Sequence, residues 1–146
     1  MMSRVTNLDS AAKRRNRCRR TVAEMLRRLG QKSHVDDEAR DMVALIVFSL
    51  HEIDEGIEQS ARAWEQRDYW YKAEALRQRW NWTRRNAAQL TFMLHEDDTE
   101  QIPAAVASLF PHFSDIRINR YMRGADLWRG CFRRLMQLPQ SHTTGS

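Results

Sequence analysis

The sequence contains little glycine, proline or cysteine: five, three and two residues in a chain of 146. Because glycine and proline mark turns, their scarcity argues against a turn-rich β-architecture and favours long helices. Cys18 and Cys131 lie far apart, and neither has a second cysteine at CxxC spacing. This pattern predicts free thiols in a cytoplasmic protein and indicates neither a disulfide framework nor a zinc site.

The chain also lacks a long apolar run. The longest spans about residues 42–50, well short of the roughly 20 residues that a membrane-spanning helix needs. No apolar segment follows the basic residues near the N-terminus, so we expect neither a secretory signal nor a transmembrane segment. With 42% hydrophobic and 29% charged residues, the chain is typical of one globular domain with its own core.

Motifs for catalysis and metal binding are missing as well. There is no glycine-rich phosphate loop, no nucleophile elbow and no local Cys/His pair. His51, Glu55 and Glu58 would share one helix face, but the Glu-x-x-His motif of di-iron bundles occurs nowhere. Glu52 and Glu55 could serve as general acid and base only inside a cleft. We therefore expect no catalytic residue, no metal and no cofactor, with an unrecognised helical enzyme as the lesser alternative.

What is present is apolar spacing of three and four residues, which is typical of amphipathic helices. It predicts an all-α fold, a compact bundle of four main helices plus one short helix. Residues 1–8 would be a flexible tail, 9–138 a single domain and 139–146 a disordered tail. The expected helices run from Asp9 or Ser10 to Gly30, from Asp36–Glu38 to Trp64, from Tyr69 to Leu94, over residues 103–110, and from an N-cap at Ser114 to just before Pro139.

The tryptophan-rich stretch from Trp64 to Leu94 is the expected centre of this bundle. Its apolar seam comprises Tyr69, Ala73, Leu76, Trp80, Thr83, Ala87, Leu90 and Leu94. The apolar face changes sides near Glu65–Asp68, which predicts a break there with Asp68 as the N-cap of the next helix. One continuous helix that changes partners is the alternative, because no glycine or proline forces a stop.

Charge is unevenly distributed along the chain. Residues 1–30 have a net charge of +7, residues 31–100 a net charge of −6 and residues 101–146 a net charge of +4. Only Lys13, Lys32 and Lys72 are lysines among the 24 basic residues. Arginine suits carboxylates, phosphates and aromatic faces better than lysine does, because its guanidinium is a planar fork of donors.

The strongest functional signal is a cluster of six basic residues within eight positions of the first helix. Such density costs self-repulsion unless an anionic partner is present, so we expect partner contact here. A solvated arm, or docking on the chain's own acidic middle, is the alternative interpretation. The cluster consists of Lys13, Arg14, Arg15, Arg17, Arg19 and Arg20.

A second candidate surface combines arginine with aromatic residues that fall outside the seams. Such side chains can anchor an interface or stack on bases. For Trp70 and Trp82, burial against another helix of the same chain is the favoured outcome. This Arg/aromatic surface comprises Trp70, Arg77, Trp82, Arg84, Arg85, Arg117, Arg120 and Arg123.

Together these patterns predict a non-catalytic helical adaptor or assembly subunit, which docks on an anionic macromolecule through its basic first and last helices. An acidic protein is the first partner to consider. Sequence-independent binding to the RNA or DNA backbone through Lys13–Arg20 is the alternative. Head-to-tail self-association fits the opposite charges. A membrane-surface helix is disfavoured, because the basic half lacks a Trp/Phe/Leu face.

Overall fold

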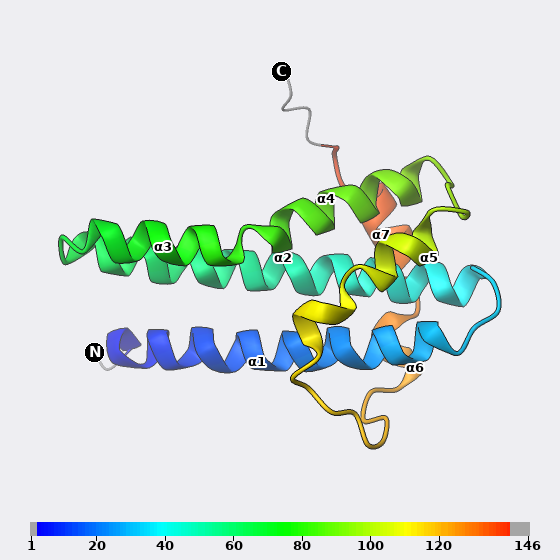
Figure 1. The fold of residues 1–146 in the computed structure, drawn as a ribbon, viewed down its shortest axis with the longest axis horizontal. Helices are drawn as coiled ribbons and strands as arrows, with labels where there is room; N and C mark the ends of the chain where they lie inside the picture. The colour runs from blue at the N-terminus through cyan, green and yellow to red at the C-terminus, as the bar shows by residue number, and fades with distance from the viewer. Residues whose placement is uncertain (1–2, 141–146) are drawn as a thin grey trace.

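The computed structural model describes the backbone of residues 3–140 and the side chains of residues 10–140. Within that part of the chain there are helices and no strands, which confirms the all-α fold (Figure 1). None of the helices described combines the length and apolar character needed to span a membrane. The elements are α1 (Ser3–Gly30), α2 (Asp37–Gln66), α3 (Trp70–Trp80), α4 (Trp82–His95), α5 (Ile102–Ala107), the 3-10 helix η1 (Phe110–Phe113), α6 (Ala125–Trp128) and α7 (Cys131–Gln137).

The central helix is α2, which corrects the expectation that the tryptophan-rich stretch lies at the centre. Helix α2 contacts α1, α3, α4, α6 and α7, and its residues 42–47 are all buried. A helix that is apolar on every side must be covered on every side. By contrast, Ala73 is the one buried residue of α3, so most of the tryptophan-rich stretch covers α2 instead of being covered.

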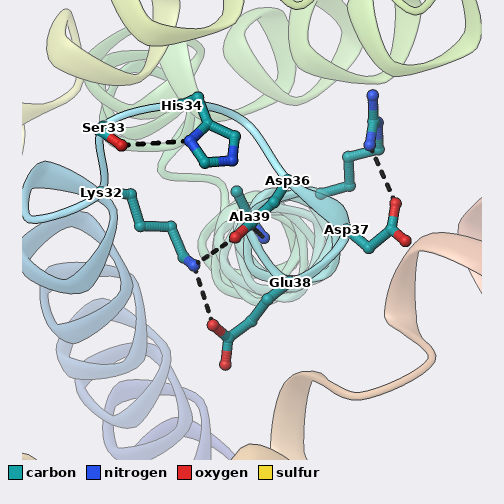
Figure 2. A network of polar contacts seen from close by, with 8 residues as sticks. Lys32, Ser33, His34, Asp36, Asp37, Glu38 and Ala39 are labelled. Carbon is teal, nitrogen blue, oxygen red and sulfur yellow. Dashed lines mark hydrogen bonds and ion pairs between the residues drawn. The ribbon is translucent and has the colours of Figure 1, made fainter.

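The start of α2 follows the sequence prediction closely. Asp36 is the N-cap, and its Oδ1 accepts the backbone N–H of Ala39 at 2.8 Å. Lys32, which lies in the turn between α1 and α2, has its Nζ 3.0 Å from Asp36 Oδ2 and 2.9 Å from Glu38 Oε1 (Figure 2). These contacts satisfy a helix terminus and fix the turn that makes α1 and α2 antiparallel neighbours.

The predicted break after α2 is present, although its N-cap was assigned wrongly. Helix α2 ends at Gln66, and Asp68 adopts a positive φ of 64° in the turn. Tyr69, not Asp68, precedes the first residue of α3. A left-handed residue ends a helix without glycine when it is Asp or Asn, whose side chains tolerate that conformation. The expected helix from Tyr69 to Leu94 is also interrupted, at Asn81 between α3 and α4.

The last predicted helix is wrong over its first half. Ser114 follows η1 and caps no further helix, and residues 114–124 are irregular. Side chains of α1 satisfy the backbone there, so the segment does not need helical hydrogen bonds. Glu24 accepts the N–H groups of Met122 and Arg123 at 3.0 and 2.9 Å, and Arg27 donates to the carbonyl of Ile118. The helix resumes only as α6 and α7, separated at Gly130, whose φ is 84°.

The N-terminal boundary differs as well. Helix α1 begins at Ser3, so residues 3–8 are helical, and Asp9 and Ser10 lie inside the helix. At the other end α7 stops at Gln137 and Pro139 follows. Residues 1–2 and 141–146, which include most of the expected C-terminal tail, lie outside the described residues.

Candidate binding groove

A groove of about 1340 Å³ separates the first half of α1 from the second half of α2. We call it the α1–α2 groove. Five of its lining residues are cations, and no aspartate or glutamate among the described side chains lines it. These cations are Lys13, Arg14, Arg15 and Arg17 of α1, and Arg67 at the end of α2. The structure therefore brings four of the six predicted cluster residues together in one concave surface.

Arg14 occupies the most enclosed position among these cations. Its Nη2 is buried and has no hydrogen-bond partner among the described groups. The guanidinium lies against α2 at Gly56, where a Cβ would stand 3.7 Å from Nη2. A buried donor without an acceptor costs free energy. This buried donor therefore belongs to the contact between α1 and α2.

Arg15 lies at the groove wall nearest α3. Its guanidinium carbon is 5.5 Å from the centre of the Trp80 ring, in cation–π geometry. Burial lowers the pKa of Arg15, and the neighbouring charges of Arg19 and Arg79 lower it further. Burial is thus the main cause, and repulsion between neighbouring cations adds to it.

Arg19 and Arg20 do not belong to the groove. Arg19 pairs with Asp115, with Nη2 2.7 Å from Oδ1, and also donates to the carbonyl of His112 at 2.8 Å. This pair lowers the pKa of Asp115 through the hydrogen bond from Arg19. Arg20 is exposed and does not line the groove. The predicted cluster thus divides into groove residues, a structural arginine and a solvated one.

Sequence reasoning missed the part of the groove that α2 contributes. Gln59, Ser60, Ala63, Trp64 and Arg67 line it at helical spacing along one face. The available signal was that spacing, because the apolar seam of α2 leads from Trp64 to Arg67 in one further step of three.

Trp64 closes the groove near the α2–α3 turn and is held by its neighbours. Tyr69 packs edge-on against it with ring centroids 5.6 Å apart. Lys72 Nζ lies 4.7 Å from the Trp64 ring centre, and the guanidinium carbon of Arg67 lies 5.8 Å from it. These contacts give this end of the groove a preformed aromatic wall with more positive charge around it.

The predicted Arg/aromatic surface is not one continuous site. Arg77 is taken up by two carboxylates, with Nη2 2.8 Å from Glu58 Oε2 and Nη1 2.5 Å from Glu65 Oε2. Those hydrogen bonds raise the pKa of Arg77 and lower those of Glu58 and Glu65. Arg84 pairs with Asp54 at 3.3 Å. These two arginines therefore join α3 and α4 to α2.

Trp82 and Trp70 have opposite environments. Trp82 is half-buried, stacked on His112 with ring centroids 3.8 Å apart, and it also packs against Trp80 and Phe113. Trp70 is 60% exposed near the tip of the α2–α3 hairpin. Burial against another part of the same chain, which the sequence favoured for both tryptophans, is therefore found for Trp82. Trp70 remains mostly exposed.

The remaining predicted residues also separate. Arg123 is held by α1, with Nε 2.9 Å from Thr21 Oγ1 and Nη1 3.6 Å from Glu24 Oε1. Arg85, Arg117 and Arg120 are exposed and lie outside the groove. They form part of the general basic surface and not part of a concave site.

The described lining of the groove consists of cationic, apolar, amide and hydroxyl side chains. No described histidine, cysteine or carboxylate lines it. Cys18, one turn beyond it, donates to Glu52 at 3.5 Å. Burial raises the pKa of the Cys18 thiol to about 12, and the Glu52 charge adds to the effect, so this thiol is unreactive. Among the described residues, no group of three or more His, Cys, Asp or Glu side chains could hold a metal ion.

What the geometry can do is bind an anion along a preformed groove. Comparisons of the chain with protein-family models, with curated proteins and with solved structures gave no match.

Proposed function

We propose that the protein is a non-catalytic helical adaptor or assembly subunit that docks on an anionic macromolecular partner through the α1–α2 groove. The observation that supports this function is the groove's lining of five cations without a described carboxylate. Concentrated like charge in a concave surface attracts counter-ions and steers oppositely charged partners toward it.

Several arginines outside the groove pair with carboxylates, whereas no described carboxylate lines the groove. Elsewhere, arginines meet carboxylates of the same chain: Arg19 with Asp115, Arg77 with Glu58, and Arg40 with Asp97. The chain has 19 acidic residues, yet no aspartate or glutamate whose side chain is described lines the groove. An external anion is the partner that this distribution favours.

An acidic protein is our first candidate partner, and binding to a nucleic-acid backbone is the second. The second is favoured by the arginines, since guanidinium groups recognise phosphates in the same bidentate manner as carboxylates. We place the protein in the cytoplasm as part of this proposal, because Cys18 and Cys131 are free and buried.

Fluorescence titration at low and high salt tests this function. The probes are poly-L-glutamate and a single-stranded oligonucleotide, and the tryptophan emission, to which Trp64 in the groove contributes, reports binding. We expect binding of at least one probe at about 50 mM salt and a steep loss of affinity at about 200 mM. Failure of both probes to bind at the lower salt concentration contradicts the proposed function.

A further inference from the structure

The groove has a shape as well as a charge, and the shape identifies a class of partner. We propose that the α1–α2 groove receives an acidic amphipathic helix from a partner protein. This inference rests on the proposed function and names its partner. It extends that function from attraction between charges to the packing of one helix into a groove between others.

The floor and the rim of the groove have different chemistry. Ala11 and Ala63 are small residues on the two facing helices, and Leu76 and Trp64 add larger apolar surface. Small residues allow a third helix to approach closely, and larger ones fill the space between its side chains. The exposed cations Lys13, Arg17 and Arg67 lie around this apolar floor. A groove lined by both apolar residues and exposed cations matches a helix that has one apolar face and acidic flanks.

The dimensions fit the same occupant. A helix with its side chains is about 10 Å across and rises about 1.5 Å per residue. A groove of about 1340 Å³ therefore accommodates about three helical turns. The amides of Gln59 and Gln66, which also line the groove, could donate to or accept from polar side chains of such a helix.

The arrangement of the chain leaves room for another helix on this side. Figure 1 shows that the segment from η1 to α6 crosses α1 from its middle toward its C-terminal end, whereas the first half of α1 runs beside α2. Contacts between α1 and η1 belong to that covered part, where Arg19 meets His112 and Asp115. A partner helix bound in the groove would pack against the first half of α1, as the segment from η1 to α6 packs against the rest of this helix.

A peptide pair distinguishes helix recognition from charge attraction alone. One probe is a capped peptide of about eleven residues, long enough to fill about three turns, with leucine at helical spacing and glutamate on both flanks. Its control is a scrambled peptide of identical composition. We expect the amphipathic peptide to bind at least about tenfold more tightly than the scrambled one, and to gain helical circular dichroism on binding. Equal affinity of the two peptides overturns this inference but leaves the proposed function standing.

A variant that blocks the floor without removing charge gives a second, independent test. Ala63→Trp should weaken binding of the amphipathic peptide by about tenfold or more. Ala88→Trp, at an exposed position of α4 outside the groove, is the matched control. If Ala63→Trp fails to fold, Gln59→Trp at an exposed groove position takes its place. Unchanged peptide affinity in the folded variant overturns the inference.

Two further results would also replace the helix with another occupant. Tighter binding of a single-stranded oligonucleotide than of the amphipathic peptide would assign the groove to nucleic acid. A dimer in light scattering that dissociates in the Ala63→Trp variant would assign it to a second copy of this chain. If neither peptide, poly-L-glutamate nor the oligonucleotide binds at about 50 mM salt, the proposed function fails together with the inference.

Discussion

Arg19 binds Asp115 through two parallel hydrogen bonds, with Nη1 3.0 Å from Oδ2 and Nη2 2.7 Å from Oδ1. The Arg19 side chain is only 17% exposed, and its guanidinium also lies 5.4 Å from the centre of the Phe113 ring. One residue of the basic cluster thus joins α1 to the segment that follows η1. Arg19 therefore belongs to the cations that hold the fold together, in contrast to the groove cations, which we propose bind a partner.

Arg19→Gln should therefore lower stability and leave groove binding nearly intact. We expect a loss of about 1 kcal/mol in the free energy of unfolding, because the Asp115 end of the pair is exposed and screened by solvent. Urea denaturation measures the loss. Affinity for poly-L-glutamate should change by less than about threefold. A loss of binding as large as that of a groove variant would place Arg19 in the binding surface instead.

Glu24 supports the irregular segment from inside the core. Its side chain is 1% exposed, and its carboxylate accepts the N–H groups of Met122 and Arg123. Glu24→Ala leaves these donors and the Arg28 and Arg123 guanidinium groups without their buried acceptor, so we expect a loss of about 3 kcal/mol or more. Chemical denaturation measures the change. Glu24→Gln, which keeps one acceptor oxygen, should lose less; equal stability of Glu24→Ala and the wild type would show that the segment does not depend on Glu24.

The stacking of His112 on Trp82 should make stability depend on pH. Burial lowers the pKa of His112, and the nearby Arg85 charge lowers it further. The unfolded chain, in which the pKa is ordinary, therefore takes up a proton more readily than the folded chain does. Stability is fully present above the ordinary histidine pKa of about 6.5 and falls as the pH drops through the lowered folded value.

His112→Phe keeps an aromatic ring against Trp82 and removes the titration. Thermal unfolding between about pH 7 and pH 5 should show a smaller decline for this variant than for the wild type. Carboxylates with lowered pKa values, such as Asp115, lose their contribution only at more acidic pH. Identical pH profiles of the variant and the wild type would contradict the role assigned to His112.

Both cysteines should resist modification in the folded protein. Cys18 is 6% exposed and Cys131 is 1% exposed, and burial raises the pKa of each thiol. Because the thiolate is the reactive form, a thiol-specific reagent should label the native protein at least about a hundredfold more slowly than the unfolded one. Absorbance of the released chromophore follows the reaction. Rapid labelling of either thiol under native conditions would show that the local structure opens readily.

Helical periodicity predicts the fold well where the apolar seam and the capping residue agree. Residues 42–47, apolar on every side, and the acidic residues Asp36–Glu38 at the helix N-terminus locate the start of α2 to within a residue. The prediction fails at residues 114–124, where Ile118 and Tyr121 have helical spacing but pack from an irregular segment. Long-range bonds from Glu24 and Arg27 stabilise that segment, and no local pattern announces them.

Only the residues that α1 contributes to the α1–α2 groove can be predicted from the sequence. The density of basic residues in α1 identifies Lys13, Arg14, Arg15 and Arg17, because charge repulsion is a property of nearby residues. Two other features depend on how α1 lies relative to distant parts of the chain. Arg19 pairs with Asp115, and Arg67 lines the groove. The packing of helices and loops against one another decides which cations lie near a carboxylate. The spacing of residues in the sequence does not reveal this packing.

The most direct measurement compares two variants that lose the same charge from different places. Arg17→Gln with Arg67→Gln removes two groove cations, and Arg117→Gln with Arg120→Gln removes two exposed arginines outside the groove. Affinity for poly-L-glutamate is measured for both at about 50 mM salt, where phosphate- and carboxylate-type contacts are strong. The groove pair should lose affinity on the order of tenfold while the control pair stays within about twofold of the wild type. Equal losses in the two variants would contradict a binding site in the α1–α2 groove.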